Sequence, residues 1–328
     1  MLKFLRRVIP AVIGMGLVLF LLCRAARLRE LIPEYPWQAD YHLLCLSFLI
    51  LTSSLFLLAV AWYYILRKLG ANLRPLAAVS AYFYSNLLRY VPGTFWYTIG
   101  RVHLAKRQDV PEDKSSVSLV LELCFSVLSA LLVGAGTWVI APGSVPVLAI
   151  LGTILFLLVI IWPPFFLRLV NGILRAIRRE EIALALRYRD MLLLLTPYVA
   201  FWIIYGTGFW VLLRSVYSGS LPSLWATITI CALSWVAGFV SFPIPQGIGV
   251  REAVMAHLLG AYVPFAVASV VALASRLLML LAEVACAAIS VITSTALSDP
   301  LKSDGIPKGR LPSGSVESDP LPEDRWGK

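Results

Sequence analysis

Residues 215–250 read SVYSGSLPSLWATITICALSWVAGFVSFPIPQGIGV and contain no charged side chain. A helix needs about 20 apolar residues to cross the hydrocarbon core of a bilayer, so this run is long enough for a transmembrane helix. The helix cannot continue to the end of the run, because the segment from Phe242 to Gly247 contains two prolines and a glycine, which interrupt helices. The run therefore predicts a membrane span followed by a broken segment.

The composition of the whole chain also indicates a membrane protein. Of its 328 residues, 59% are hydrophobic and 14% are charged, whereas a soluble chain carries about 25% charged residues. The sequence shows no alternation of apolar and polar residues of the kind found in β-barrel strands. The apolar runs predict spans near residues 8–23, 43–66, 116–140, 146–167, 191–213, 221–242 and 265–297, and broken segments near 76–100 and 243–262.

These runs predict an all-α integral membrane protein with about eight transmembrane helices, in which two Pro/Gly-broken re-entrant segments form a pseudo-repeat. Residues 1–297 would form the polytopic membrane domain. From residue 298 to 328 the chain is rich in Pro, Ser, Gly, Asp and Lys, a composition too polar to build a core, so we expect a disordered tail. The first span lacks a small-residue cleavage site, and we therefore expect it to be retained as a signal anchor.

Basic residues gather in three loops. The first loop contains Arg67, Lys68 and Arg74, the second contains Lys106, Arg107 and Lys114, and the third contains six arginines between residues 168 and 189. Basic residues favour the cytoplasmic side of a membrane, so we place the N-terminus and loop 168–190 of a cell-membrane protein in the cytoplasm. The first two loops can share that side only if residues 75–100 enter the membrane and return. This requirement predicts the first re-entrant segment.

Ionisable residues are rare within the predicted membrane segments, where each costs about 2.5–3.5 kcal/mol even on the gentler insertion scales. They lie in or beside the broken segments or in the helices that follow them: Arg89, Arg101, Glu122, Arg251, Glu252, Arg276 and Glu283. In the first half, Arg101 follows the break and Glu122 lies in the next span. In the second half, Glu252 follows the break and Arg276 lies in the next span. Broken segments in corresponding positions of two halves are typical of transporter substrate sites.

The predicted substrate site combines these charges with the breaks. Its substrate-binding residues are Arg101, Glu122, Arg251, Glu252 and Arg276, and its walls are Pro92, Gly93, Gly100, Pro245, Gly247 and Gly249. Backbone groups freed at a break cannot face lipid, so they are buried in protein or line a wet cavity, and arginine binds phosphate through two parallel hydrogen bonds. An alternative stays open, in which Arg101–Glu122 and Glu252–Arg276 are fixed ion pairs between helices. For Arg89 we expect a side chain that snorkels to the interface.

Two motifs carry a family resemblance. The arrangement Asn86-x5-Pro92-Gly93-x6-Gly100-Arg101, the later Pro245-x-Gly247-x-Gly249-x2-Glu252 and the lone Arg276 resemble the lysylphosphatidylglycerol synthase transmembrane family. This is the flippase-like membrane domain of the multiple peptide resistance factor, which also occurs as stand-alone proteins. The chain departs from the family pattern at Gln246, where the family usually has glycine, and at Thr94, where it has a basic residue.

The resemblance implies about eight transmembrane helices with paired re-entrant elements and a role in moving a lipid across the bilayer. It does not imply lysyl transfer, because we find no counterpart of the family's soluble aminoacyl-transferase domain and expect a stand-alone member. A lipid translocase is therefore favoured over an enzyme. Two alternatives are an intramembrane transferase, which would add a sugar or an aminoacyl group to a lipid with Glu122 or Glu252 as base, and a non-catalytic assembly partner.

The expected partners are membrane lipids with an anionic or polyprenyl-linked headgroup rather than nucleic acid, because the basic residues mark a membrane side. A homo-oligomer and a partnership with a lipid-biosynthesis enzyme both stay open. No cofactor and no metal is predicted, since the five cysteines and three histidines lie singly, without the spacing of metal ligands.

Overall fold

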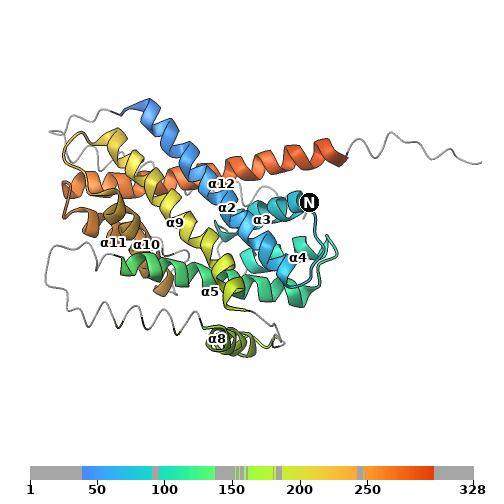
Figure 1. Cartoon of the computed structure of the whole chain (residues 1–328). Coiled ribbons are helices and arrows are strands. Elements are labelled where there is room, and N and C mark those ends of the chain that lie inside the picture. The colour runs from blue at the N-terminus through green and yellow to red at the C-terminus, as the bar shows by residue number, and fades with distance from the viewer. Residues whose placement is uncertain are drawn as a thin grey trace, which may run out of the picture.

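The computed structural model of the chain describes residues 39–90, 96–136, 162–179, 187–241 and 249–298, together with residues 152, 155, 159, 181 and 247. The span predicted over 8–23, most of that over 146–167 and the tail after residue 298 lie outside these ranges. Every regular element in the described part is helical (Figure 1): α2 (Tyr41–Lys68), α3 (Pro75–Leu87), the 3₁₀ helix η1 (Leu88–Tyr90), α4 (Trp96–Lys106), α5 (Glu112–Ala135), α8 (Pro163–Ala176), α9 (Tyr188–Val216), α10 (Leu224–Val240), α11 (Val250–Leu259) and α12 (Phe265–Ser298).

Four described helices are long and apolar enough to cross a membrane, namely α2, α5, α9 and the part of α12 from Phe265 to Ser290. They correspond to the spans predicted over 43–66, 116–140, 191–213 and 265–297. Helix α10 is also apolar, but its 17 residues are fewer than the roughly 20 that a full crossing takes. The prediction of an all-α, multi-pass membrane protein is confirmed. The number of eight crossings depends partly on residues outside the described ranges and stays a prediction.

Helices α2 and α9 form the centre of the bundle and run side by side (Figure 1). At one end Asp40 accepts hydrogen bonds from the backbone N–H groups of His42 and Leu43, which caps the start of α2, and its own N–H donates to the Ser215 carbonyl near the end of α9 at 2.9 Å. At the other end Lys68 Nζ lies 2.6 Å from Asp190 Oδ1. These contacts fix the two helices antiparallel.

The core is divided among three apolar clusters. The first joins α2, α5 and α9–α12 around Trp202. The second joins α2, α5, α8 and α9 around Phe125, whose ring lies 5.1 Å from that of Phe166 and 5.8 Å from that of Tyr198. The third joins α2, α3 and α12 around Trp62 and Tyr82. Helix α12 therefore packs against both the first and the last parts of the bundle.

The three basic loops lie together at one end of the bundle. Lys114 Nζ donates to the Gly70 carbonyl at 2.9 Å, which joins the first loop to the second. Arg179 Nη1 lies 3.8 Å from Asp113 Oδ1, which joins the second region to the third. With the Lys68–Asp190 contact, these interactions bring the ends of α2 and α4 to the same end of the bundle as the starts of α5 and α9.

Each broken segment separates two helices that pack against each other. Helices α3 and α4 flank the first break, and α10 and α11 flank the second. Figure 1 shows α3 and α4 at one end of the bundle and α10 and α11 at the other. The breaks predicted near Pro92 and Pro245 therefore fall between helices, although both prolines lie outside the described residues.

The span predicted over 146–167 differs from the structure at its C-terminal end. Pro163 begins α8, because proline has a backbone angle suited to the first turn of a helix and no N–H that the helix must satisfy there. Helix α8 buries Phe166, Val170 and Leu174 against the second cluster. Residues 163–167 therefore belong to an amphipathic helix that extends to Ala176.

The close contact of α9 and α10 depends on Gly206. A Cβ added there would lie 2.6 Å from the backbone Cα of Ile228, so the helices would have to separate. We expect Gly206→Ala to lower the free energy of unfolding by about 1–3 kcal/mol, as overpacking of a core does. Thermal unfolding in detergent micelles measures this change.

Gly172 on α8 provides the matched control, since a Cβ added there meets nothing within 4 Å. Gly172→Ala should leave stability unchanged or raise it slightly, because alanine favours helix over glycine. Equal destabilisation by both substitutions would contradict the proposed packing role of Gly206.

Candidate functional site

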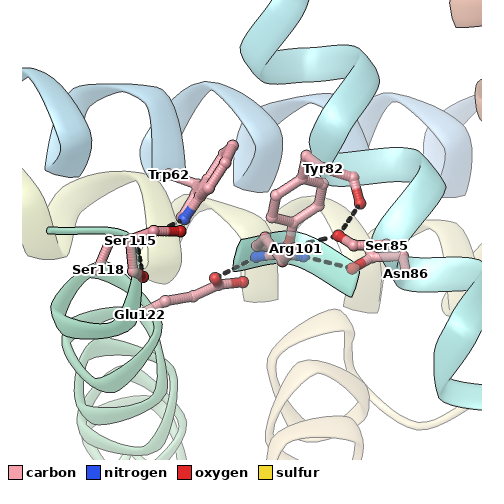
Figure 2. A network of polar contacts seen from close by, with 8 residues as sticks. All are labelled: Trp62, Tyr82, Ser85, Asn86, Arg101, Ser115, Ser118 and Glu122. Atoms are coloured by element: carbon pink, nitrogen blue, oxygen red, sulfur yellow. Dashed lines mark hydrogen bonds and ion pairs between the residues drawn. The ribbon is translucent and has the colours of Figure 1, made fainter. Parts of the chain in front are cut away.

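Arg101 on α4 reaches the core of the first half because of the glycine before it. A Cβ on Gly100 would overlap the side chain of Leu88 on η1, so the absence of a side chain lets α4 lie directly against η1. Asn86 and Ser85 on α3 then face Arg101 (Figure 2). The predicted wall residue Gly100 is thus a close-approach position between the two limbs of the broken segment.

The Arg101 guanidinium bonds to three side chains from two helices (Figure 2). Its Nε donates to Ser85 Oγ at 2.8 Å, its Nη2 donates to Asn86 Oδ1 at 2.6 Å, and its Nη1 pairs with Glu122 on α5. Such bonds between charged partners are stronger than neutral ones. The side chain is 0% exposed, so no ligand reaches Arg101 in this conformation.

Aromatic rings complete the enclosure of Arg101. The guanidinium carbon lies 4.1 Å from the ring centre of Tyr82, 4.6 Å from that of Tyr97 and 5.1 Å from that of Trp62. Trp62 is held in turn by a 3.0 Å hydrogen bond from its Nε1 to Ser118 on α5 (Figure 2). Rings facing a cation within about 6 Å stabilise its charge, more so when water is excluded.

In the second half the glutamate precedes the arginine along the chain, and the two charged groups lie farther apart than in the first half. Glu252 on α11 lies 3.4 Å from Arg276 on α12, measured from Oε1 to Nε. The other oxygen of Glu252 accepts a 2.6 Å hydrogen bond from the backbone N–H of Gly249 and so caps the start of α11. Both side chains retain some exposure, 12% for Glu252 and 11% for Arg276.

Two glycines shape the backbone of the second break. Gly247 and Gly249 have positive φ angles of 59° and 90°, a region that residues with side chains rarely adopt. A Cβ on Gly247 would lie 2.5 Å from the Cα of Gly238 on α10. The break therefore packs backbone against backbone on α10, which explains why glycine is required at a predicted wall position.

Arg251 faces the same region as Glu252 and Arg276. Its Nη2 donates to the Tyr205 hydroxyl on α9 at 2.9 Å. A cavity of about 10 Å³ lies among these side chains and is lined by Tyr205, Arg251, Glu252, Met255, Ala272, Ser275 and Arg276. This volume is enough for about one water molecule. The cavity is too small for a phosphate-bearing headgroup in this conformation.

A third ion pair was not predicted from the sequence. Arg89 on η1 lies 3.5 Å from Glu283 on α12, measured from Nη1 to Oε1, and its guanidinium carbon lies 5.3 Å from the ring centre of Tyr97. We expected Arg89 to snorkel, but it contacts a buried carboxylate. The available signal was weak: Glu283 lies two helical turns beyond Arg276, and the sequence left both Arg89 and Arg251 without an assigned partner.

The structure brings the predicted site residues together in two places rather than one. Arg101 and Glu122 form an enclosed pair in the first half, whereas Arg251, Glu252 and Arg276 line a small cavity in the second. Both ion pairs foreseen in the alternative interpretation are present. Gly100, Gly247 and Gly249 lie beside the breaks, and Pro92, Gly93 and Pro245 lie outside the described residues. Helix α12 forms ion pairs in both halves, because it pairs Arg276 with α11 and Glu283 with η1.

Comparison with known proteins identifies one family. Residues 7–286 match the family described as "Lysylphosphatidylglycerol synthase TM region". The match includes every predicted site residue and most of the helical bundle. No curated protein matches the chain.

The enclosed pair generates a stability prediction. Glu122→Gln would leave Arg101 charged and buried without its counter-charge, and breaking a buried ion pair in this way costs about 3–5 kcal/mol. Thermal or denaturant unfolding in detergent micelles should show a loss of this size.

The control is Glu112→Gln, which removes an exposed carboxylate paired with Lys106 at 2.6 Å. Exposed pairs contribute little, so its unfolding should match that of the unsubstituted protein. If Glu122→Gln proved as stable as this control, Arg101 would not depend on the pair.

Proposed function

The chain belongs to the lysylphosphatidylglycerol synthase transmembrane family, and from this membership we propose that it is a lipid translocase. It moves the headgroup of a phospholipid, or of a polyprenyl-linked or other glycolipid, across the bilayer while the lipid tails stay in the hydrocarbon. The observation that carries this proposal is the arrangement of charges. The described intramembrane arginines and glutamates form ion pairs beside the two broken segments, and two of these pairs involve α12.

In this proposal the two broken segments are re-entrant hairpins that enter the membrane from opposite sides. Helices α3 and α4 pack together, and the loops before and after them are joined by the Lys114–Gly70 contact. Helices α10 and α11 also pack together, at the other end of the bundle. Inverted repeats with broken helices near the midplane are the architecture of many transporters, and their sites lie at the breaks.

The headgroup site of this proposal is the cavity beside Arg251, Glu252 and Arg276. Two guanidinium groups suit a phosphate, which arginine binds through paired hydrogen bonds, and Ser275 and Tyr205 add hydroxyl groups. Because the cavity has room for only about one water molecule, the proposal treats this structure as a closed conformation. Binding of a headgroup would require α11 to move away from α12.

The Arg101–Glu122 pair occupies the equivalent place in the first half. Its arginine is fully buried, whereas both charged side chains of its counterpart retain partial exposure. We infer that this half stays closed when the second half opens, so that a headgroup reaches the site from one side at a time. The fixed-pair alternative assigns Arg101 a purely structural role. The partners of the protein in this proposal are anionic or polyprenyl-linked lipids of the cell membrane.

A transport assay tests this function. Liposomes that contain the purified protein should carry headgroup-labelled anionic phospholipid across the bilayer faster than protein-free vesicles. Arg276→Lys keeps the charge but loses the planar fork that matches phosphate. We expect it to slow transport by about 10- to 150-fold, the effect of losing about 1.5–3 kcal/mol from a hydrogen bond to a charged group.

Arg175→Gln is the matched control, because Arg175 is an exposed arginine on α8 that pairs with Glu181, and transport should be unchanged. Equal crossing in protein-free vesicles would overturn the proposal. A new lipid species in the mass spectrum of the recovered lipids would instead support the transferase alternative.

The proposed hairpin topology has a separate test. In a variant without native cysteines, single cysteines at Asn72, Gln108 and Ala176 should react with a membrane-impermeant thiol reagent from the same side. A cysteine at Ser218, beyond the end of α9, should react only from the opposite side. In intact cells the first three should be protected, since we place the three basic loops in the cytoplasm. Labelling of residues 72 and 108 from different sides would rule out a re-entrant α3–α4 segment.

A further inference from the structure

Glu283 is a buried carboxylate with incomplete hydrogen bonding. Its side chain is 3% exposed, and within the described part of the chain its Oε2 atom is buried without a hydrogen-bond partner. Its Oε1 atom lies 3.5 Å from Nη1 of Arg89, beyond the roughly 2.7–3.2 Å of a direct N–H···O bond. Nearly all buried polar groups in proteins are hydrogen-bonded, so an exception of this kind requires an explanation.

We propose that Glu283 is a proton-binding site, in which the proton and Arg89 are alternative partners of the same carboxylate. This inference rests on the proposed lipid translocation for its purpose, which is to couple proton movement to a displacement of α12. The existence of the site does not depend on that function. Arg89 and Glu283 do not line the headgroup cavity, and the proton site gives these two residues a role.

The position of Arg89 allows this exchange. Arg89 lies on η1, at the end of the helix that precedes the first break, and its side chain is 25% exposed. Arg101, by contrast, is fully enclosed and bonded to Ser85, Asn86 and Glu122. Arg89 can therefore be displaced while the Arg101 network keeps α3, α4 and α5 together.

The physical reason for proton binding is the cost of an isolated buried charge. When Arg89 moves away, the Glu283 carboxylate would remain in the membrane interior with neither a cation nor a donor, which is strongly unfavourable. A proton taken from water then binds one carboxylate oxygen and forms an O–H bond. The charge of Glu283 changes from −1 to zero. When Arg89 returns, the O–H bond breaks and the proton leaves to water.

The surroundings contain few other charged or titratable groups that could take this role. Tyr97 on α4 and Cys286 on α12 lie within electrostatic range of Glu283. Helices α2 and α3 face this part of α12 with a mainly apolar cluster that includes Tyr82. Toward α9 and α11 the charged and titratable groups are Tyr205, Arg251, Glu252, His257 and Arg276, and Glu252 is already paired with Arg276.

Helix α12 links the proton site to the headgroup cavity. Glu283 and Arg276 are seven residues apart, which places them two turns, or about 10.5 Å, apart along one face of the helix. Arg276 pairs with the second broken segment and Glu283 with the first. A displacement of α12 that accompanies the exchange at Glu283 is thus transmitted directly to Arg276.

Infrared spectroscopy of the purified full-length protein in lipid tests the site without reference to transport. As the pH is lowered, the carboxylic-acid C=O absorption of the protein should gain a component band that is missing in Glu283→Gln. Glu112→Gln, which removes an exposed carboxylate, should retain it. In Arg89→Gln, whose Glu283 lacks its cation, the band should appear at a pH where the unsubstituted protein does not show it, because a nearby positive charge favours the ionised form.

A second measurement tests the coupling. In liposomes an imposed proton gradient should change the rate of lipid crossing for the unsubstituted protein and leave Glu283→Gln unaffected. Glu283→Asp keeps the carboxyl group and should retain both the infrared band and the response to the proton gradient. If Glu283→Gln does not fold, Glu283→Asp is compared with Arg89→Gln instead. A band that persists in Glu283→Gln, or that is unchanged in Arg89→Gln, would overturn the proton site. A band with the expected behaviour in a protein that moves no lipid would overturn only the translocase proposal.

Discussion

The guanidinium of Arg101 is buried away from water, so the first half of the bundle must surround this charge with hydrogen-bond acceptors and aromatic rings. The charge is tolerated because Ser85, Asn86 and Glu122 accept its hydrogen bonds and three aromatic rings surround it. These groups come from α2, α3, α4 and α5, so one side chain holds four helices in place (Figure 2). Moving any of these helices would expose the charge to lipid, which makes this half the rigid part of the structure.

The three intramembrane ion pairs differ in how firmly they are held. In Arg101–Glu122 the arginine is fully buried, Glu252–Arg276 borders a cavity, and Arg89–Glu283 leaves one carboxylate oxygen without a partner in the described structure. The last two pairs share α12, whereas the Arg101–Glu122 pair does not involve it. Movement between conformations is therefore expected to occur around α12, against a first half fixed by Arg101. The proposed headgroup and proton sites both lie where this movement would take place.

Much of this arrangement could be predicted from the sequence, because a charged residue in a membrane segment is rare and costly. That rarity identified Arg101, Glu122, Glu252 and Arg276, and their order along the chain gave the two pairs. The Arg89–Glu283 pair could not be predicted, since no spacing rule relates residues so far apart in sequence. Ser85 gave no signal, because serine is common in membrane helices. The start of α8 at Pro163 was also missed, since its apolar face continues the preceding hydrophobic run.

The distance along the chain between Arg89 and Glu283 has a consequence for biosynthesis. Membrane helices are made and inserted in chain order. Arg101 finds Glu122 in the helix that follows its own, so the first broken segment can neutralise that charge early. Arg89 finds its carboxylate only after α12, the last helix described, has been made. We therefore expect the nascent first half to stay incompletely packed beside the translocon until synthesis is nearly finished. A chain that ends before α12 should be recognised by membrane quality control.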